Sequence, residues 1–236
     1  NLVLGQLKVN EKSNEITAIP KLLEMLDLSG CIVTIDAMGC QKAIAQRIID
    51  KNADYVLALK GNQGRLHENV ELFFKDQIER NFAEGDVDTH RTVDVDHGRV
   101  EVREYWSVSS INWLEEKKDW KSLQAIGCAR LTSRIGEETT IYDRYYILSR
   151  PMDAQAFGDA VRRHWGIENK LHWVLDVTFR EDESRIRRGN GPHNMGVIRH
   201  VALNLLKKEK AKRSLSGKRL RAAFNDDYRA KVLCAI

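Results

Sequence analysis

An α/β fold is predicted by three features of this 236-residue chain. Two short apolar runs rich in β-branched side chains, residues 31–35 and 54–59, flank a helical pattern over residues 41–50. A mostly-β region with period-two alternation follows, and apolar residues then return at helical spacing from Phe157 onward. Strands that alternate with helices predict a helix-covered sheet, in which the two apolar runs are parallel neighbours of a right-handed βαβ unit.

Composition sets the class of protein. Hydrophobic residues make up 42% of the chain and charged residues 31%, which is typical of a globular protein rather than a disordered one. No run approaches the ~18 apolar residues of a membrane span, and no signal peptide opens the chain. The four cysteines lack CxxC spacing, which argues against a zinc knuckle or a disulfide framework and fits a reducing compartment.

Positive charge is concentrated at the C-terminal end. Residues 207–236 hold ten Lys/Arg and three Asp/Glu, a net charge of +7, whereas the whole chain carries +4. A basic tail on a near-neutral body is the usual footprint of a polyanionic partner such as nucleic acid. A tail that is merely solvated explains the charge equally well.

The first two thirds of the chain supply most of the predicted elements. Alternating and apolar residues predict a strand over residues 2–9, and because this pattern starts at once, we expect the chain to begin inside a domain. Further helices are predicted over residues 15–26, 41–50 and 66–81, with Ser13 or Asn14 capping the first of them. Turn signals separate four predicted strands over residues 92–95, 99–108, 123–135 and 138–148.

Two polar side chains follow the apolar strands. Asp36 comes directly after the run 31–35, and Lys60 opens the turn after the run 54–59. Ligands of open α/β sheets gather beyond the carboxyl ends of parallel strands, so Asp36 is a candidate ligand and Lys60 a candidate phosphate contact. Asp36 as a cap of the next helix and Lys60 as a solvated surface lysine remain open alternatives.

Glu168 falls within the apolar stripe of the late helix. The stripe consists of Phe157, Val161, Trp165, Leu171 and Leu175. His164 and His172 flank Glu168 by one turn on each side. Burying an unpaired carboxylate costs several kcal/mol, so Glu168 needs a partner. A structural ion pair and a metal ligand are both compatible with this pattern.

The last third of the chain continues with a charged segment and one more helix. Residues 176–188 hold four acids and four arginines, which predicts a loop that forms ion pairs or contacts a nucleic-acid backbone. A helix is predicted over residues 194–208. Its inward residues are predicted to be Val197, Val201, Leu205 and Leu206.

Asp36 and Glu168 together indicate metal chemistry. A helix that packs on the sheet could bring Glu168 to the strand end where Asp36 lies. Carboxylates are the ligands that Mg²⁺ and Mn²⁺ prefer, and two such ions about 4 Å apart can cleave phosphodiesters. Two distant carboxylates are a weak signal by themselves.

Four stretches carry a resemblance to a known family. They are Ile35-Asp36-Ala37-Met38-Gly39 with Gln41, Leu59-Lys60-Gly61-Asn62-Gln63, His97-Gly98-Arg99-x-Glu101-x-Arg103, and His164-Trp165-x-Ile167-Glu168-Asn169-x-Leu171-His172-Trp173-x-Leu175-Asp176-Val177. In this order they resemble the bacterial insertion-sequence transposases known as H-repeat-associated proteins, which are DDE transposases. The resemblance covers nearly the whole chain, and its last motif is highly specific.

The resemblance implies a ribonuclease H-like catalytic core that is incomplete at its N-terminal end. The core would comprise residues 1–81 and 151–206, with a mostly-β insertion at 82–150 and a basic C-terminal tail at 207–236. Asp36 then matches the second catalytic aspartate of the family.

Glu168 matches the family's glutamate, and the first aspartate is expected upstream of Asn1. Related transposases carry Tyr-x2-Arg-x3-Glu-x6-Lys around the glutamate. This chain has Val161, His164 and Leu175 at the three other positions, and Arg162 or Arg163 is a candidate substitute for the arginine.

We therefore expect part of a bacterial DNA transposase that cleaves and transfers strands with Mg²⁺, for which Mn²⁺ can substitute. Asp36 and Glu168 are the expected catalytic and metal-binding residues. The expected DNA contacts are Lys60, Asn62, Arg99, Arg162, Arg163, His164, Asn169, His172, Arg185, Arg187 and Arg188. The expected partners are double-stranded DNA and a second copy in a homodimer, and the expected location is the cytoplasm, at the nucleoid during action. This chain alone is expected to be inactive, because it matches two of three carboxylates.

Two rival functions stay open. A zinc hydrolase is suggested by His164, Glu168 and His172, which share one helix face, although the His-Glu-x-x-His pattern is absent and zinc content would decide. A non-catalytic DNA-binding remnant of a transposase is compatible with the missing first aspartate.

Overall fold

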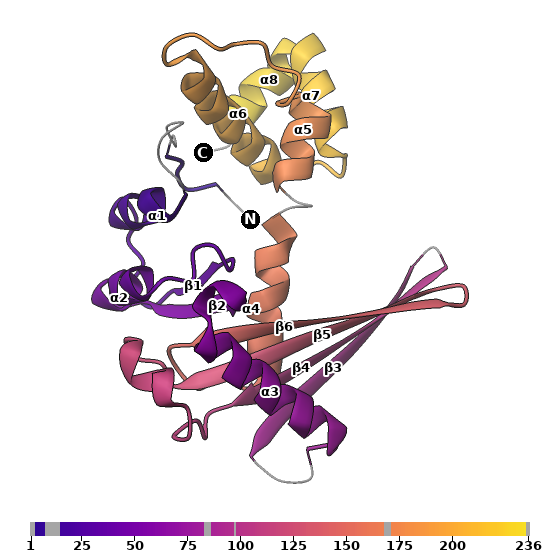
Figure 1. The fold of residues 1–236 in the computed structure, drawn as a ribbon. Helices are drawn as coiled ribbons and strands as arrows, with labels where there is room; N and C mark the ends of the chain where they lie inside the picture. Colours follow the sequence, from indigo (N-terminus) through magenta and orange to yellow (C-terminus); the bar gives the residue numbers. More distant parts are fainter. Residues whose placement is uncertain (1–2, 8–14, 83–85, 97, 168–170, 235–236) are drawn as a thin grey trace. The chain divides into compact units, whose positions relative to one another are not determined.

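The computed structural model describes residues 3–7, 15–82, 86–96, 98–167 and 171–234 (Figure 1). The chain divides into two compact units. The first, Val9–His164, contains the sheet and is called the sheet unit below. The second combines Asn1–Lys8 with Trp165–Ile236 and is called the helical unit.

A six-stranded mixed sheet forms the centre of the sheet unit, in the order β1-β2-β6-β5-β4-β3. The strands are β1 (Ile32–Ile35), β2 (Asp54–Leu59), β3 (Val87–Asp96), β4 (Arg99–Val108), β5 (Ala125–Ile135) and β6 (Glu138–Leu148). β1 and β2 run parallel, with α2 (Lys42–Asp50) between them in sequence, and the other neighbours are antiparallel. The predicted α/β class and the parallel strand pair are confirmed.

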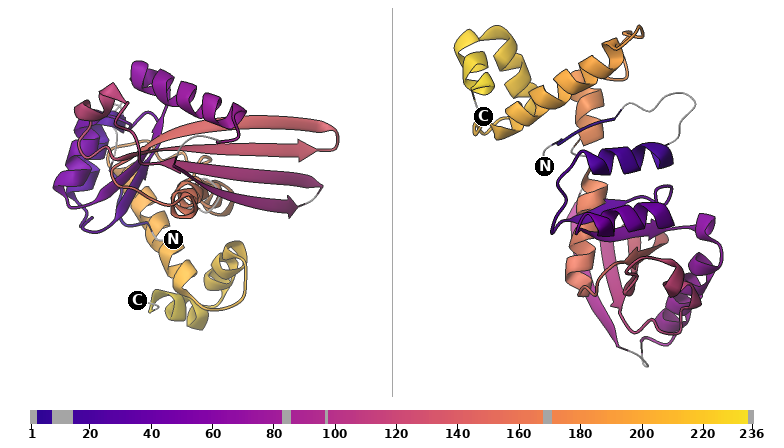
Figure 2. Two further views of the ribbon diagram at one scale, coloured as in Figure 1. Left: turned by 90° about the horizontal axis from the view of Figure 1, so that it is seen from below. Right: turned by 90° about the vertical axis from the view of Figure 1, so that its left-hand side faces the viewer.

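Helices cover both faces of this sheet (Figure 2). α1 (Glu15–Glu24), α2 and α3 (Arg65–Glu79) contribute to the large core on one face, with Phe74 of α3 fully buried against Tyr145. α4 (Ala154–Ile167) lies on the opposite face, where Phe157 sits over Gly127 of β5. A Cβ atom at position 127 would lie 2.6 Å from the Phe157 ring, so glycine is required for this close approach.

Burial of large side chains stabilises the sheet unit. Tyr55, Phe74 and Phe157 are each at most 1% exposed. A fully buried side chain of this size contributes about 1.5–3 kcal/mol through the hydrophobic effect, and truncating such a phenylalanine to alanine costs about 3–5 kcal/mol. The core therefore fixes the positions of the strand ends that it supports.

The helical unit is built from α5 (Trp173–Phe179), α6 (Gly191–Lys208), α7 (Leu215–Phe224) and α8 (Asp226–Leu233). Leu203 of α6 packs against Val174 and Leu175 of α5 in a small apolar core. The side chains of Ser214 and Asn225 cap α7 and α8, each accepting a hydrogen bond from a backbone N–H three residues on. Much of the predicted basic tail is therefore helical.

A buried carboxylate joins the last helices of the helical unit. Glu209 accepts hydrogen bonds from the Tyr228 hydroxyl at 2.8 Å and from the Ala211 N–H at 3.0 Å, and Lys231 lies 3.2 Å away. Burial favours the neutral acid, but these donors outweigh it and lower the pKa of Glu209 to about 2. Lys218 adds a bond to the backbone oxygen of Leu206 at the end of α6.

Several expectations about elements need correction. The described residues 3–7 contain no strand; instead the Val3 backbone exchanges two hydrogen bonds with the Asn204 side chain. Val197 and Val201 of α6 are 39% and 52% exposed rather than inward, because Leu203 and Leu206 take the buried positions. In the part of the chain that is described, no helix is both long enough and apolar enough to span a membrane.

Candidate functional site

The ends of β1 and β2 place the predicted polar residues at one edge of the sheet. Because the two strands are parallel and Ile35 pairs with Leu57, Asp36 and Lys60 both leave the sheet at its carboxyl side. Asp36 and Lys60 are both exposed. The predicted strand-end positions are thus confirmed, and the loop Asp36–Cys40 lies beside the turn Lys60–Gly64.

Asp36 organises its own loop. Its Oδ1 atom accepts a hydrogen bond of 3.2 Å from the backbone N–H of Gly39. The N-cap of α2 is Gln41, so Asp36 is not the helix cap that was considered as an alternative. The Oδ2 atom makes no hydrogen bond or ion pair with the residues that are described, and this oxygen is available to a ligand.

Two side-chain amides connect the turn after β2 to the Asp36 loop. The Asn62 amide nitrogen donates to the backbone oxygen of Ala37 at 2.8 Å. The amide nitrogen of Gln63 donates to the backbone oxygen of Cys40 at 2.6 Å. The loop is therefore held at two carbonyl groups by the neighbouring strand's turn.

Gly39 lies where a side chain does not fit. A Cβ atom there would be 2.3 Å from Cγ2 of Ile35 and 2.8 Å from Cδ1 of Ile19. These apolar neighbours press against the backbone of the loop. Close packing thus adds to the hydrogen bonds that fix the path of the chain after Asp36.

Cys40 is not a plausible ligand at this edge. The residue is fully buried, and burial raises the pKa of its thiol to about 12. Because no part of Cys40 is accessible to solvent, its thiol offers no ligand atom to an ion at the surface of this edge. The oxygen atoms of Asp36 are the more suitable donors.

A histidine joins α4 to the strand that ends at Asp36. The Nδ1 atom of His164 lies 3.1 Å from the hydroxyl oxygen of Thr34 on β1. Either group can donate, depending on the tautomer of the imidazole. This contact fixes the C-terminal part of α4 to β1 two residues before Asp36.

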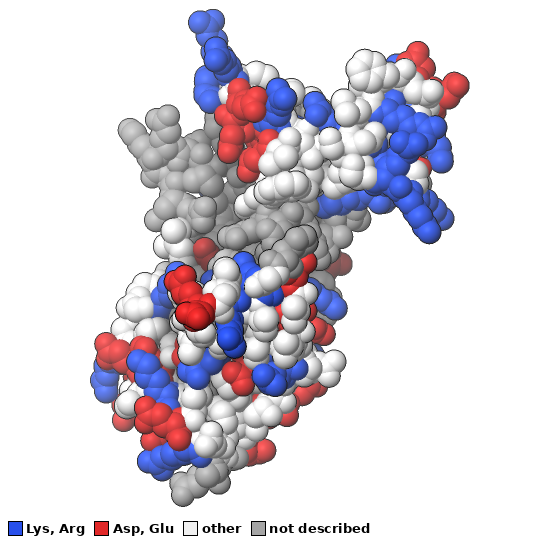
Figure 3. Space-filling view, turned by 90° about the vertical axis from the view of Figure 1, so that its right-hand side faces the viewer, with Lys and Arg blue, Asp and Glu red and all other residues white. Residues whose placement is uncertain are grey.

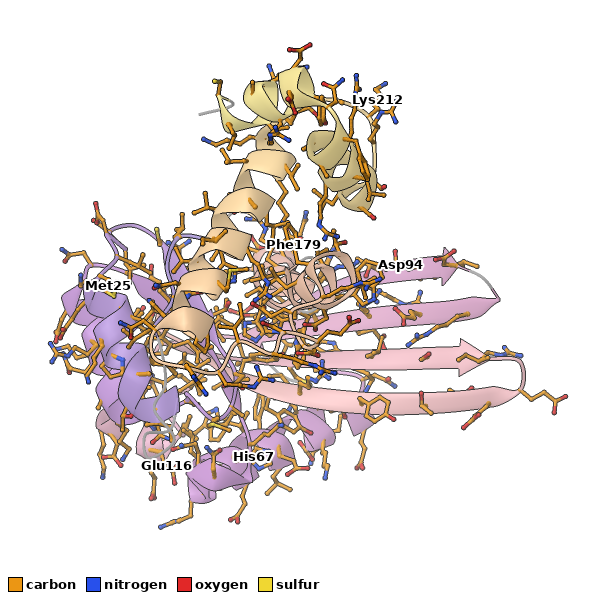
Figure 4. The ribbon with its side chains drawn as sticks, turned by 90° about the horizontal axis from the view of Figure 1, so that it is seen from above. Met25, His67, Asp94, Glu116, Phe179 and Lys212 are labelled. Atoms are coloured by element: carbon orange, nitrogen blue, oxygen red, sulfur yellow. The ribbon has the colours of Figure 1, made fainter. Side chains whose placement is uncertain are left out.

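Arg99, Glu101 and Arg103 of the third quoted motif form an ionic cluster on the α4 side of the sheet. Arg99 and Arg103 both contact Glu101, and Arg103 also contacts Asp94 of β3. Asp94, labelled in Figure 4, further accepts a 3.0 Å hydrogen bond from Arg162 of α4. This bond and the neighbouring arginine charges lower the pKa of Asp94. The cluster ties β3, β4 and α4 together.

The other predicted site residues are spread over both units. Glu168 and Asn169 lie outside the described residues, so their distances to Asp36 stay predictions. His172 precedes α5 and is exposed. Exposed arginines are also found at the remaining predicted positions. These are Arg163, Arg185, Arg187 and Arg188.

The donor set at the strand ends fits a hard divalent cation. Asp36 offers a free carboxylate oxygen, which is the type of ligand that Mg²⁺ and Mn²⁺ prefer. No group of three His, Cys, Asp or Glu side chains able to hold a metal occurs within the described ranges. A complete site therefore requires at least one further carboxylate, for which Glu168 is the predicted residue.

The sequence did not indicate the roles of Gln63 and Thr34 beside the Asp36 loop or of Asp94 in the ionic cluster, although Gln63 stands in a quoted motif. Its signal was a second amide beside Asn62 in a turn that directly follows a strand. Thr34 and Asp94 gave no comparable signal, because their partners are distant in sequence.

Comparison with known proteins agrees with these motifs. The family described as "Transposase DDE domain" matches residues 1–205. The chain is 46% identical over 241 residues to "Putative transposase YncI" of Escherichia coli O157:H7, covering 99% of the chain and 60% of that protein. It is 43% identical over 239 residues to "H repeat-associated putative transposase YhhI" of Escherichia coli strain K12, covering 99% of the chain and 62% of that protein. The chain thus spans about three fifths of the length of these relatives.

Proposed function

Because this chain belongs to the transposase DDE-domain family, we propose that it forms part of the catalytic domain of a DNA transposase that cleaves and transfers strands. The resemblance implied the same family from four motifs. The single observation that carries the proposal is the exposed Asp36 at the end of a parallel strand, whose second carboxylate oxygen has no partner among the described residues. Asp36 is the position that the resemblance matches to a catalytic aspartate.

The placement of α4 supports a second carboxylate at this site. His164 ties the end of α4 to β1 close to Asp36, and Glu168 follows His164 by four residues in the sequence. We expect the carboxylates of Asp36 and Glu168 to lie within roughly 4–8 Å of each other, a separation that allows shared metal ions. The first aspartate of the family would be a third ligand.

Asp36 and Glu168 would hold Mg²⁺, for which Mn²⁺ can substitute. The ions would activate the attacking hydroxyl and stabilise the leaving oxygen of the phosphodiester. The chain's own contribution would be to hold the carboxylate of Asp36 on a rigid strand end, since small misplacements lower rates strongly. Zinc binds histidine and cysteine in preference to carboxylate oxygens, so it suits this pair of residues less well than Mg²⁺ does.

The proposed substrate is double-stranded DNA at the element ends and at the target. Lys60 would contact a phosphate beside Asp36, and the remaining cationic and polar residues would hold the backbone. They are Arg99, Arg162, Arg163, His164, Asn169, His172, Arg185, Arg187 and Arg188. Arg99 and Arg162 already pair with Glu101 and Asp94, so their contacts with DNA would have to share these partners. A homodimer on the DNA is part of the same proposal.

The fold proposal is a ribonuclease H-like core from residues 1–81 and 151–206, with residues 82–150 as an insertion. The parallel pair β1–β2 and the late helix α4 support it. The strands of residues 82–150 continue the same sheet through the β2–β6 pair. The insertion would therefore extend the core sheet rather than form a detached module.

A nicking assay tests the proposed activity. Labelled DNA that carries the ends of the element is incubated with Mg²⁺ or Mn²⁺ and either this chain or a longer protein that extends it upstream to the length of its relatives. We expect cleavage by the longer protein alone, and loss of cleavage by more than about 100-fold in Asp36→Asn and Glu168→Gln. Asp27→Asn is the matched control, because Asp27 is an exposed aspartate whose oxygen caps only Ser29.

The outcomes separate the competing functions. Tight DNA binding without cleavage by the longer protein would favour a non-catalytic remnant. Stoichiometric zinc that is lost in His164→Ala or His172→Ala would favour a zinc hydrolase. Cleavage that survives Asp36→Asn would refute the assignment of Asp36.

A further inference from the structure

Side-chain amides donate hydrogen bonds to three backbone oxygens of the loop after β1. Ala37, Met38 and Cys40 each offer a backbone oxygen to a side-chain amide. The donors are Asn62, Gln41 and Gln63, at distances of 2.8, 3.3 and 2.6 Å. Two of these donors come from the turn after β2, so the loop cannot move independently of that turn.

The turn that supplies the two amides is itself rigid. Residues Gly61–Gln63 form a short 3-10 helix, with the Gln63 N–H bonded to the Lys60 oxygen at 3.0 Å. α3 begins at Arg65 immediately afterwards and is anchored in the core by Leu66 and Val70. The two amides therefore link the Asp36 loop to a turn that is itself held in place by the packed helix α3.

The donors are neutral, and this is chemically significant beside a carboxylate. A lysine or arginine in their place would pair with Asp36 and compete with a metal ion for its charge. Amide donors hold neutral backbone oxygens and leave the charge of Asp36 intact. The side-chain nitrogens contact carbonyl groups on each side of Gly39, whose own N–H binds Asp36.

We infer that Asn62 and Gln63 are positioning residues, which hold the Asp36 loop against the end of β2 so that Asp36 presents its free oxygen to the metal and DNA. This inference rests on the proposed function for its catalytic meaning. It gives Asn62 a structural partner inside the protein, whereas the sequence suggested a contact with DNA. The two roles make different kinetic predictions.

The first experiment measures the loop itself in the 236-residue chain. Asn62→Leu and Gln63→Met remove the donors and nearly keep the side-chain size. Amide hydrogen exchange at Gly39 and its neighbours should become at least about 5-fold faster, as expected for the loss of a hydrogen bond of about 1 kcal/mol. Gln46→Met is the matched control, because the Gln46 amide bonds to Asp50 on the exposed side of α2.

The second experiment separates positioning from DNA contact in the longer protein. Asn62→Leu and Gln63→Met should lower kcat for strand cleavage about 10- to 100-fold while the Kd for DNA stays near the parental value. The melting temperature should fall by no more than the few degrees that one lost hydrogen bond costs. A raised Kd with unchanged kcat would overturn the inference and make Asn62 a DNA contact. Unchanged Gly39 exchange in both variants would also overturn it.

The two levels of failure remain distinguishable. If the longer protein with native residues does not cleave DNA, the proposed function fails. Hydrogen exchange then still decides whether the two amides hold the loop. If cleavage is normal in the variants although loop exchange is faster, the loop contacts exist but do not position Asp36 for the reaction, and the inference is refuted.

Discussion

The Nδ1 atom of His164 lies 3.1 Å from the hydroxyl oxygen of Thr34, and this contact joins the helix that leads toward Glu168 to the strand that ends at Asp36. Both residues are partly buried. The resemblance matches this position to an arginine of related transposases. In this chain a shorter, hydrogen-bonded imidazole takes part in the packing of α4 on the sheet, and its effect can be measured as a coupling energy.

Thr34→Val and His164→Leu, singly and combined, should show a coupling of about 0.5–1.5 kcal/mol in the free energy of unfolding. The reason is that either substitution alone already removes the hydrogen bond. Urea denaturation of the four proteins gives the measurement. Thr140→Val combined with His164→Leu is the control, and additive effects are expected there, since Thr140 bonds to Ser133 within its own hairpin.

Gly39→Ala should displace the Asp36 loop. The new methyl group would lie within 2.8 Å of both Ile35 and Ile19, and overpacking of this kind costs about 1–3 kcal/mol. We expect a lower melting temperature and faster exchange of the loop amides. Ile19→Val in the same background should recover part of the lost stability, because valine lacks the Cδ1 atom with which Ile19 of α1 contacts the new methyl group. A fully stable Gly39→Ala protein would show that the loop is more plastic than its packing suggests.

The helical unit should lose stability in acid through Glu209. The pKa of this carboxyl is lowered to about 2 in the folded chain, so its contribution is present above its ordinary pKa and is lost as the pH falls from about 4.5 to 2. In Glu209→Gln, the melting temperature should be lower at pH 7 and should depend less on pH over this interval. Asp226→Asn serves as the control, because Asp226 is an acid on the exposed side of α8.

Neutralising the basic segment should weaken DNA binding in a salt-dependent way. The variant replaces Lys207, Lys208, Lys210, Lys212 and Arg213 by glutamine. Figure 3 shows Lys and Arg side chains crowded over the part of the molecule that α5–α8 form. For each phosphate that the variant no longer binds, the slope of log K against log salt should fall by about 0.9. Lys212, labelled in Figure 4, is one of the exposed cations of this segment.

A matched control removes five lysines and arginines that already pair with acids on the sheet unit. They are Lys42, Arg47, Lys75, Arg80 and Arg150. Their replacement by glutamine changes the net charge of the protein equally. If both variants alter the salt slope to the same extent, the effect is one of overall charge, and residues 207–213 have no special contact with DNA.

Local patterns in the sequence were sufficient for most elements of the sheet unit. β2, β4 and β6 have the predicted bounds, because alternation and turn residues mark both ends of each strand. The strand-end position of Asp36 also followed from the sequence, since an apolar run was followed by a polar residue and a helix. These are properties of neighbouring residues.

Features that depend on distant residues were not predicted. The place of β6 between β2 and β5, the bond between His164 and Thr34, and the link from Asn62 to Ala37 all join parts that no local period connects. The two last helices were missed for another reason. Their signals, the caps Ser214 and Asn225, were obscured by the charge of the surrounding segment.

The pairing of β2 with β6 sets the order in which the polypeptide can acquire its structure during synthesis. Leu59 of β2 pairs with Tyr145 of β6, and Tyr145 leaves the ribosome long after Leu59 does. Until β6 is synthesised, the apolar strand β2 has one hydrogen-bonding edge without its final neighbour. The hairpins β3–β4 and β5–β6 can each close locally. The nascent chain is therefore exposed to aggregation at β1–β2 before the sheet is complete, and chaperones that bind extended apolar segments should recognise it there.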